Sequence, residues 1–224
     1  MSFFATKITD EWGSSFELTG AGYAVLVLIM VVILLAACLI GGGNRKKKFS
    51  TRQLVFSAAA MALAMVTSMI KLFELPMGGS VTLLSMLFIC LIGYWFGLSG
   101  GLMAAVAYGF LQLIVDPYII SIPQMLVDYI FGFGALGLSG IFSDKKHGLV
   151  LGYLLGVVGR FVFTFLSGVI FFGIYAADYG MTAAAYSFLY NGSYIAAEAI
   201  ITIVIIMLPP VAKGLQRIKT MALE

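Results

Sequence analysis

The feature that most constrains this chain is a series of seven apolar runs separated by short polar stretches. They lie at about residues 20–40, 52–72, 81–96, 100–115, 123–142, 149–175 and 184–211. A helix needs ~20 apolar residues to cross a hydrocarbon core about 30 Å thick. Hydrophobic residues make up 62% of the chain and charged residues 10%, whereas soluble domains average about 45–50% and about 25%. The excess apolar surface must face lipid, which excludes a soluble enzyme, a disordered tail and a nucleic-acid-binding protein.

The third and fourth runs are short for membrane spans, and Gly97, Gly100 and Gly101 lie between them. Short, glycine-hinged spans are typical of tilted or irregular helices that pack inside protein. The first run is set apart from the others by a plausible linker, GGGNRKKK, at 41–48. We therefore predict an all-α fold, a polytopic membrane helical bundle with a six-helix core and one additional N-terminal transmembrane helix.

The distribution of charge predicts the orientation of the chain. Acidic residues precede the first run and basic residues follow it at 45–52, which is the reverse of a signal peptide. Because cytoplasmic loops are enriched in Lys and Arg, the N-terminus is expected outside and the C-terminus in the cytoplasm. The predicted parts are an extracellular segment over 1–19, the additional helix and basic cytoplasmic linker over 20–48, the membrane core over 49–213 and a cytoplasmic tail over 214–224.

Four charged residues fall within the apolar runs, where charge is costly and usually functional or paired. Lys71 lies near the end of its run and can extend to the membrane surface. Arg160 and Glu198 fall at similar depth in antiparallel neighbours, which favours a structural ion pair over contact with a ligand. Asp128 has no basic residue at its own depth, and we favour contact with a cationic or amide-bearing ligand over structural pairing.

Aromatic and amide residues gather at the same predicted depth as Asp128. Tyr186, Tyr190 and Tyr194 recur every four residues and therefore lie close to one helix face, and Asn191 belongs to the same stretch. A pocket that holds a flat cation between tyrosine faces and an ordinary interfacial aromatic belt are equally compatible with this pattern. The turn-forming residues at 75–80 are either a lid for such a pocket or a plain connector.

Small residues recur every four positions in the second run, where Ala58 and Ala62, and Ala60 and Ala64, form two pairs. Such faces allow close approach of helices, either inside the bundle or against another membrane subunit. No phosphate-binding motif is present, so the chain itself is not expected to hydrolyse ATP. The single histidine, His147, lies in a basic loop without a nearby nucleophile, and we predict no catalytic residues, metal site or cofactor.

A set of ordered motifs over about residues 51–210 resembles the thiamine-specific substrate-binding (S) components of bacterial energy-coupling factor (ECF) transporters. The motifs are LPMGGSVTL (75–83), YGFLQ (108–112) with DPY (116–118), PQMLVDY (123–129), GRF (159–161), SGVIFF (167–172) and YSFLYNGSY (186–194). The resemblance implies a non-enzymatic, six-helix subunit of the bacterial cell membrane. In this family the subunit captures thiamine outside the cell and works with a transmembrane coupling protein and two cytoplasmic ATPases.

The resemblance also implies roles for individual residues. Carried over by position, the thiamine contacts are Tyr118, Asp128, Tyr129, Tyr186 and Asn191. The position of a family histidine is occupied by Thr164, which can form hydrogen bonds but cannot stack or titrate. The surface for the coupling protein corresponds to Ala58, Ala62 and Ala64.

Two alternatives to a thiamine importer subunit stay open. Because Thr164 replaces the histidine, the ligand could be a thiamine precursor or a related vitamin. The chain could also be an independent secondary transporter that moves protons through Asp128 or Glu198. The sequence shows no internal repeat, which weakens this second alternative.

Overall fold

The computed structural model describes residues 5–10, 13–22, 24–25, 28 and 50–224. The predicted additional helix over 20–40 and its linker lie largely outside these residues. In the segment that precedes this predicted helix, β1 (Ala5–Asp10) and β2 (Gly13–Leu18) form an antiparallel hairpin with Ala5 opposite Leu18. The predicted extracellular segment is therefore folded into strands, which its polar composition alone did not indicate.

The second apolar run forms a helix that is shorter than predicted. Helix α2 (Thr51–Ser68) begins at a capping box in which Ser50 and Gln53 bind each other's backbone N–H groups. It ends before Lys71, because β3 (Lys71–Glu74) pairs with β4 (Ser80–Thr82) across a short 3₁₀ turn, η1 (Pro76–Gly78). The prediction that this run continues as a helix to residue 72, and that the next helix begins at 81, is therefore wrong.

The third and fourth apolar runs form the two arms of a helical hairpin. Both belong to α3 (Ser85–Val115), which is interrupted at Gly97, where φ is 79° and ψ is −174°. A side chain is strained at this positive φ, so glycine suits the turn. A Cβ atom built on Gly101 would lie 2.8 Å from the Cα of Gly93, although an uninterrupted helix would separate these residues by about 12 Å. The glycine hinge predicted between the two runs is therefore present.

The fifth run changes helix type along its length. It begins with one α-helical turn, α4 (Ile122–Met125), continues as the π-helix η2 (Leu126–Gly132) and ends as the 3₁₀ helix η3 (Ala135–Phe142). Glycines allow η3 to approach the α3 hairpin closely, since a Cβ on Gly137 would lie 2.5 Å from the backbone nitrogen of Leu102. The widened π-helical turn carries Asp128 and Tyr129.

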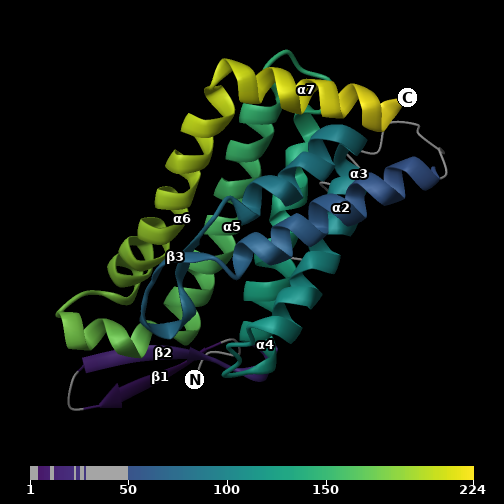
Figure 1. Cartoon of the computed structure of the whole chain (residues 1–224). Coiled ribbons are helices and arrows are strands. Elements are labelled where there is room, and N and C mark those ends of the chain that lie inside the picture. Colours follow the sequence, from purple (N-terminus) through teal and green to yellow (C-terminus); the bar gives the residue numbers. More distant parts are fainter. Residues whose placement is uncertain (1–4, 11–12, 23, 26–27, 29–49) are drawn as a thin grey trace.

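The last two runs form long helices followed by a helix across the end of the bundle. Helix α5 (Gly148–Phe171) leads through the 3₁₀ helix η4 (Gly173–Tyr179) into α6 (Ala183–Met207). The run predicted to reach residue 211 breaks at Leu208, because Pro209 and Pro210 start a new helix, α7 (Pro209–Leu223). The predicted tail is thus mostly helical, and α7 crosses the end opposite α4 and the β1–β2 hairpin (Figure 1).

The predicted class, a helical membrane bundle, is confirmed. Among the described residues, four segments are long and apolar enough to cross a membrane, namely Ser85–Val115, Ile122–Phe142, Gly148–Phe171 and Ala183–Met207. Helix α2 packs on α3, the α3 hairpin packs on η3 and α5, and α5 packs on α6. The interior of this bundle includes Ala64, Ile89, Ile92, Leu136 and Tyr153.

Candidate functional site

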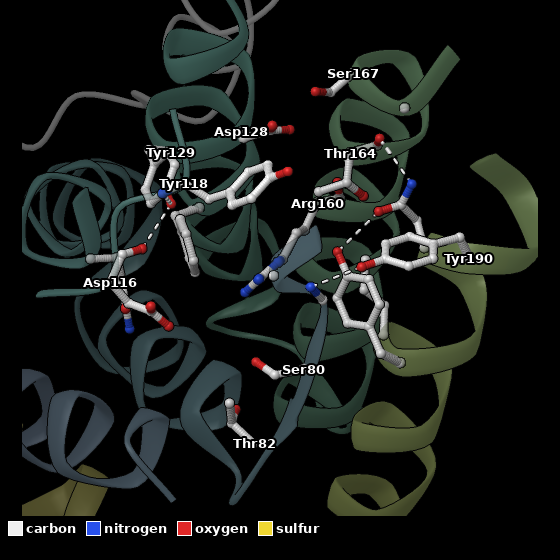
Figure 2. Close-up of a pocket in the computed structure, with 18 of the residues that line it drawn as sticks. Ser80, Thr82, Asp116, Tyr118, Asp128, Tyr129, Arg160, Thr164, Ser167 and Tyr190 are labelled. Carbon is white, nitrogen blue, oxygen red and sulfur yellow. Dashed lines mark hydrogen bonds between the residues drawn. The ribbon is translucent and has the colours of Figure 1, made fainter. Parts of the chain in front are cut away.

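A cavity of about 150 Å³ lies within the bundle, and its wall includes the β3–β4 turn and the start of α6, which lie toward the end opposite α7 (Figure 1). Its wall is built by the β3–β4 turn, both arms of α3, the Ile122–Phe142 segment, α5 and α6. All six residues predicted to bind the ligand lie in this wall (Figure 2), and they are Tyr118, Asp128, Tyr129, Thr164, Tyr186 and Asn191. Their positions make one binding site possible, and their contacts define what each can offer a ligand.

Asp128 is held by a glutamine one helical turn earlier. Ser121 caps α4 by accepting a hydrogen bond from the backbone nitrogen of Gln124. The Gln124 side chain is 1% exposed and donates to Asp128 Oδ2 at 2.6 Å and to the carbonyl of Tyr118 at 3.1 Å. Gln124 therefore fixes both residues, a role that the sequence interpretation missed although the i, i+4 spacing to Asp128 was a usable signal.

Tyr118 and Tyr129 are joined at the outer rim of the cavity. The Tyr129 hydroxyl accepts from the Tyr118 backbone nitrogen at 2.6 Å and donates to the Asp116 carbonyl at 2.8 Å. The Tyr118 ring stacks on Phe172 with 6.0 Å between ring centroids. These contacts hold two aromatic faces on one side of the cavity, and add Phe172 to the residues that shape it.

Helix α6 supplies a ladder of tyrosines on the facing side. Tyr186 stacks on Tyr179 and on Tyr190, with centroid distances of 5.3 and 5.8 Å, and Tyr190 meets Tyr194 edge to face at 5.9 Å. The spacing of four residues indicated this shared face. Because Tyr186, Tyr190 and Tyr194 line the cavity, the pocket interpretation is favoured over a belt that contacts only the membrane interface.

Asn191 and Thr164 join α5 to α6 below this ladder. The Asn191 amide nitrogen donates to the backbone carbonyl of Thr164 at 3.2 Å, and its oxygen accepts from the Tyr194 hydroxyl at 3.0 Å. The Thr164 hydroxyl donates to the carbonyls of Arg160 and Phe161, in its own helix. The Asn191 oxygen keeps a second lone pair for a ligand, and the Thr164 hydroxyl, whose proton is already donated within α5, can only accept a hydrogen bond from a ligand.

Arg160 and Glu198 do not form the predicted ion pair. Glu198 accepts from the backbone nitrogens of Thr82 and Met86 at 3.1 and 3.0 Å and from the Thr82 hydroxyl at 2.6 Å. These donors compensate the buried carboxylate and attach α6 to the start of α3. Arg160 instead places its guanidinium 4.1 Å from the centroid of the Phe133 ring. Both residues line the cavity, so the prediction of a structural ion pair is wrong in its pairing, and similar depth along the helices did not identify their partners.

The β3–β4 turn covers part of the cavity and is fastened to α6. The Tyr190 hydroxyl accepts from the Gly79 backbone nitrogen at 3.0 Å and donates to the Pro76 carbonyl. A Cβ on Gly79 would lie 2.8 Å from this hydroxyl oxygen, so a larger residue would displace the turn. These contacts agree with the lid interpretation of residues 75–80.

Ion pairs hold the same turn to the end of α3. Lys71 Nζ lies 2.9 Å from Glu74 Oε1 and 2.9 Å from Asp116 Oδ2. Hydrogen bonds to Glu74 and Asp116 raise the pKa of Lys71 above its ordinary value of 10.5, so the ammonium stays charged at physiological pH. Lys71 therefore has a structural role, in that it joins the β3–β4 turn to the end of α3.

The predicted partner surface on α2 is only partly accessible. Ala58 and Ala62 are exposed on one face of the helix. Ala64 is 0% exposed, and its carbonyl accepts a hydrogen bond from Tyr108 inside the bundle. Ala64 therefore packs inside the bundle, and its predicted place in the docking surface is wrong. The face formed by Ala58 and Ala62 is exposed.

These features define a multi-pass helical membrane protein with a polar, tyrosine-rich cavity. Proteins that capture a small solute for transport have this arrangement, in which convergent polar groups fix a ligand between apolar walls.

Comparison with known proteins identifies the family. Residues 54–217 match the thiamine transporter protein family, and the chain belongs to it. The thiamine transporter ThiT of Bacillus subtilis (strain 168) is 31% identical over 168 residues, which cover 69% of this chain and 85% of that protein. A solved structure of ThiT from Listeria monocytogenes is similar with a TM-score of 0.57 and 25% identity, and covers 70% of this chain and 94% of that one. The family resemblance and the non-enzymatic character inferred from the sequence are confirmed.

Proposed function

We propose that this chain is the thiamine-binding S component of an ATP-driven ECF importer. The observation that carries this proposal is the placement of the Asp128 carboxylate in a cavity walled by tyrosine rings. Thiamine has a permanently cationic thiazolium ring and an aminopyrimidine ring that offers an amine donor and nitrogen acceptors. Tyrosine faces attract the cation, and the carboxylate can bind the amine.

The proposed binding residues are Tyr118, Asp128, Tyr129, Tyr186 and Asn191, in the cavity wall. Asp128 accepts from the ligand amine, and Asn191 contributes the free lone pair of its amide oxygen. Thr164 contributes shape and an acceptor oxygen but no donor, because its hydroxyl proton is bound to the α5 backbone. A related pyrimidine is an alternative ligand, because Thr164 stands where the family has a histidine.

The exposed Ala58–Ala62 face of α2 is the proposed contact for the transmembrane coupling protein, which two cytoplasmic ATPases would drive. Small residues permit close helix approach in a membrane, where packing rather than hydrophobic burial drives association. The proposed orientation places the cavity outside and α7 in the cytoplasm. It is supported by the basic residues of α7 (Lys213, Arg217 and Lys219) at the end opposite the cavity.

Equilibrium binding to the purified chain tests the ligand. Thiamine, hydroxymethylpyrimidine and pyridoxine would each be titrated in detergent while intrinsic fluorescence is recorded. Selective binding of thiamine is expected. Preference for hydroxymethylpyrimidine or pyridoxine would assign a different ligand, and no binding of any of them to folded protein would contradict the proposal.

Uptake by cells tests the coupling mechanism. Import that stops when the ATPases of the coupling module are inactivated, but continues when the proton gradient is dissipated, is expected of an ECF subunit. The reverse dependence would favour an independent proton-coupled transporter.

A further inference from the structure

Arg160 has no ionic partner in the described part of the chain. It extends from α5 into the cavity (Figure 2), and its guanidinium carbon lies 4.1 Å from the centroid of the Phe133 ring. The ion pairs formed among the described residues belong to Lys71, and no hydrogen bond from the Arg160 guanidinium is found there. Because a charge at membrane depth is costly without a partner, a ligand that offers acceptor atoms would be bound favourably beside it.

The other charged residues of the cavity wall are engaged to different degrees. Asp116 pairs with Lys71, and Glu198 accepts hydrogen bonds from Thr82 and Met86. Asp128 accepts from the neutral Gln124 amide and has no cation within ion-pair distance among the described residues. The cavity thus presents one carboxylate acceptor and one guanidinium donor whose charges are left for a ligand.

We propose that Arg160 is a specificity-determining residue that donates a hydrogen bond to a ring nitrogen of an aminopyrimidine, while Asp128 accepts from the exocyclic amine of the same ring. This inference rests on the proposed thiamine-binding function and adds a ligand contact to it. Both side chains line the same cavity, and an aminopyrimidine offers them an amine donor and ring-nitrogen acceptors at separate positions of one ring. The guanidinium carbon lies over the Phe133 ring, and a guanidinium that rests on a ring keeps its in-plane N–H groups for hydrogen bonds.

The same charges determine which way the ligand lies. A guanidinium repels the thiazolium cation, so the pyrimidine end lies at Arg160 and Asp128 and the thiazolium end lies along Tyr186 and Tyr190. A ligand anion is disfavoured, since the wall carries three carboxylates, Asp116, Asp128 and Glu198, and Arg160 is its single cation among the described residues. Arg160 therefore acts as a hydrogen-bond donor to a neutral ring rather than as a counter-ion.

The first test changes the ligand and leaves the protein intact. Thiamine is compared with its two pyridyl analogues, in each of which one pyrimidine nitrogen is replaced by C–H. We expect the full-length chain to bind at least one analogue about 10- to 100-fold more weakly than thiamine, because a charged donor is then left unpaired. Equal binding of thiamine and both analogues would overturn the inference alone, whereas failure to bind thiamine would overturn the proposed function as well.

The second test removes the donor. Arg160→Met is expected to bind thiamine at least about tenfold more weakly and to lose discrimination against that analogue. Arg160→Lys is expected to keep only part of this discrimination, because a lysine lacks the planar, forked set of N–H donors of a guanidinium. The control is Arg217→Met, an exposed cation of α7 outside the cavity wall. Thermal unfolding of each variant separates misfolding from loss of contact.

Two results of the second test would overturn the inference. Equal weakening of thiamine and both analogues in a folded Arg160→Met variant would show a structural role. Unchanged thiamine binding with selective loss of thiamine monophosphate would show that Arg160 binds an anion.

Discussion

Asp128 illustrates how single residues control this site. Its carboxylate is positioned by Gln124, whose amide also holds the Tyr118 backbone. Asp128 itself lies in the π-helix η2. Such π-helical turns are frequent at functional sites. Position and charge of this one group therefore depend on a buried neighbour and on an irregular backbone.

Asp128→Asn should weaken thiamine binding by about tenfold or more, because a hydrogen bond to a charged group is worth about 1.5–3 kcal/mol. The variant keeps the size of the side chain and loses its charge. Asp144→Asn, in the exposed turn at the other end of the bundle, is the matched control and should bind like the parent. Unchanged affinity of Asp128→Asn, measured by titration, would remove Asp128 from the site.

Tyr190→Phe should accelerate thiamine release about tenfold, since it removes both hydrogen bonds to the β3–β4 turn and each contributes about 0.5–1.5 kcal/mol. The ring stack on Tyr186 is retained. Stopped-flow dissociation would measure the effect, with Tyr179→Phe, outside the cavity wall, as the control. If release is unchanged, the turn does not restrain the ligand.

The residues show what sequence reasoning can and cannot reach. The tyrosine face of α6 followed from spacing alone, and the ordered motifs contain Tyr118, Asp128, Tyr129, Tyr186 and Asn191, all of which line the cavity. The partners of Arg160 and Glu198 could not be predicted, because the Glu198 carboxylate is compensated by backbone N–H groups of the β4–α3 junction. Backbone donors leave no sequence signal.

At the scale of elements, the apolar runs located the membrane segments better than they located the ends or the helix types of those segments. The β3–β4 hairpin was missed because its strands are only four and three residues long. The α, π and 3₁₀ turns of 122–142 depend on close glycine contacts with the α3 hairpin, which involve residues distant in sequence. The hinge at Gly97 could be predicted, because glycines are clustered between two short apolar runs.

Helix α2 has two alanine faces with different expected roles. Replacing Ala58 and Ala62 by leucine should abolish ATP-dependent uptake and preserve thiamine binding, because bulk is added on the exposed face. Ala64→Leu should instead lower the unfolding temperature, because overpacking a core typically costs about 1–3 kcal/mol. Uptake and binding assays on the same membranes would distinguish the faces. Loss of thiamine binding in the double variant would show that Ala58 and Ala62 support the bundle itself.

At the scale of the whole molecule, the cluster of basic residues and the cavity lie at opposite ends of the bundle. Helix α7 is fastened to the exposed turn before α5, where Lys219 donates to the Ser143 carbonyl and lies 3.8 Å from the Tyr94 ring centroid. Arg52 at the start of α2 also reaches this end, at 3.5 Å from the Met221 carbonyl. The opposite end holds Glu74 and Asp116 beside the cavity. This asymmetry follows the positive-inside pattern.

The asymmetry makes the orientation testable in intact cells. In a background with Cys38→Ser and Cys90→Ala, cysteines would be introduced as Asp178→Cys in η4 and Lys146→Cys in the turn beside α7, both at exposed positions. A membrane-impermeant maleimide should label the first without treatment and the second only after permeabilisation, because the positive end is expected inside. Thiamine uptake by both variants provides the control for folding. The reverse labelling would place the cavity toward the cytoplasm, and capture from outside would then require a different entry route.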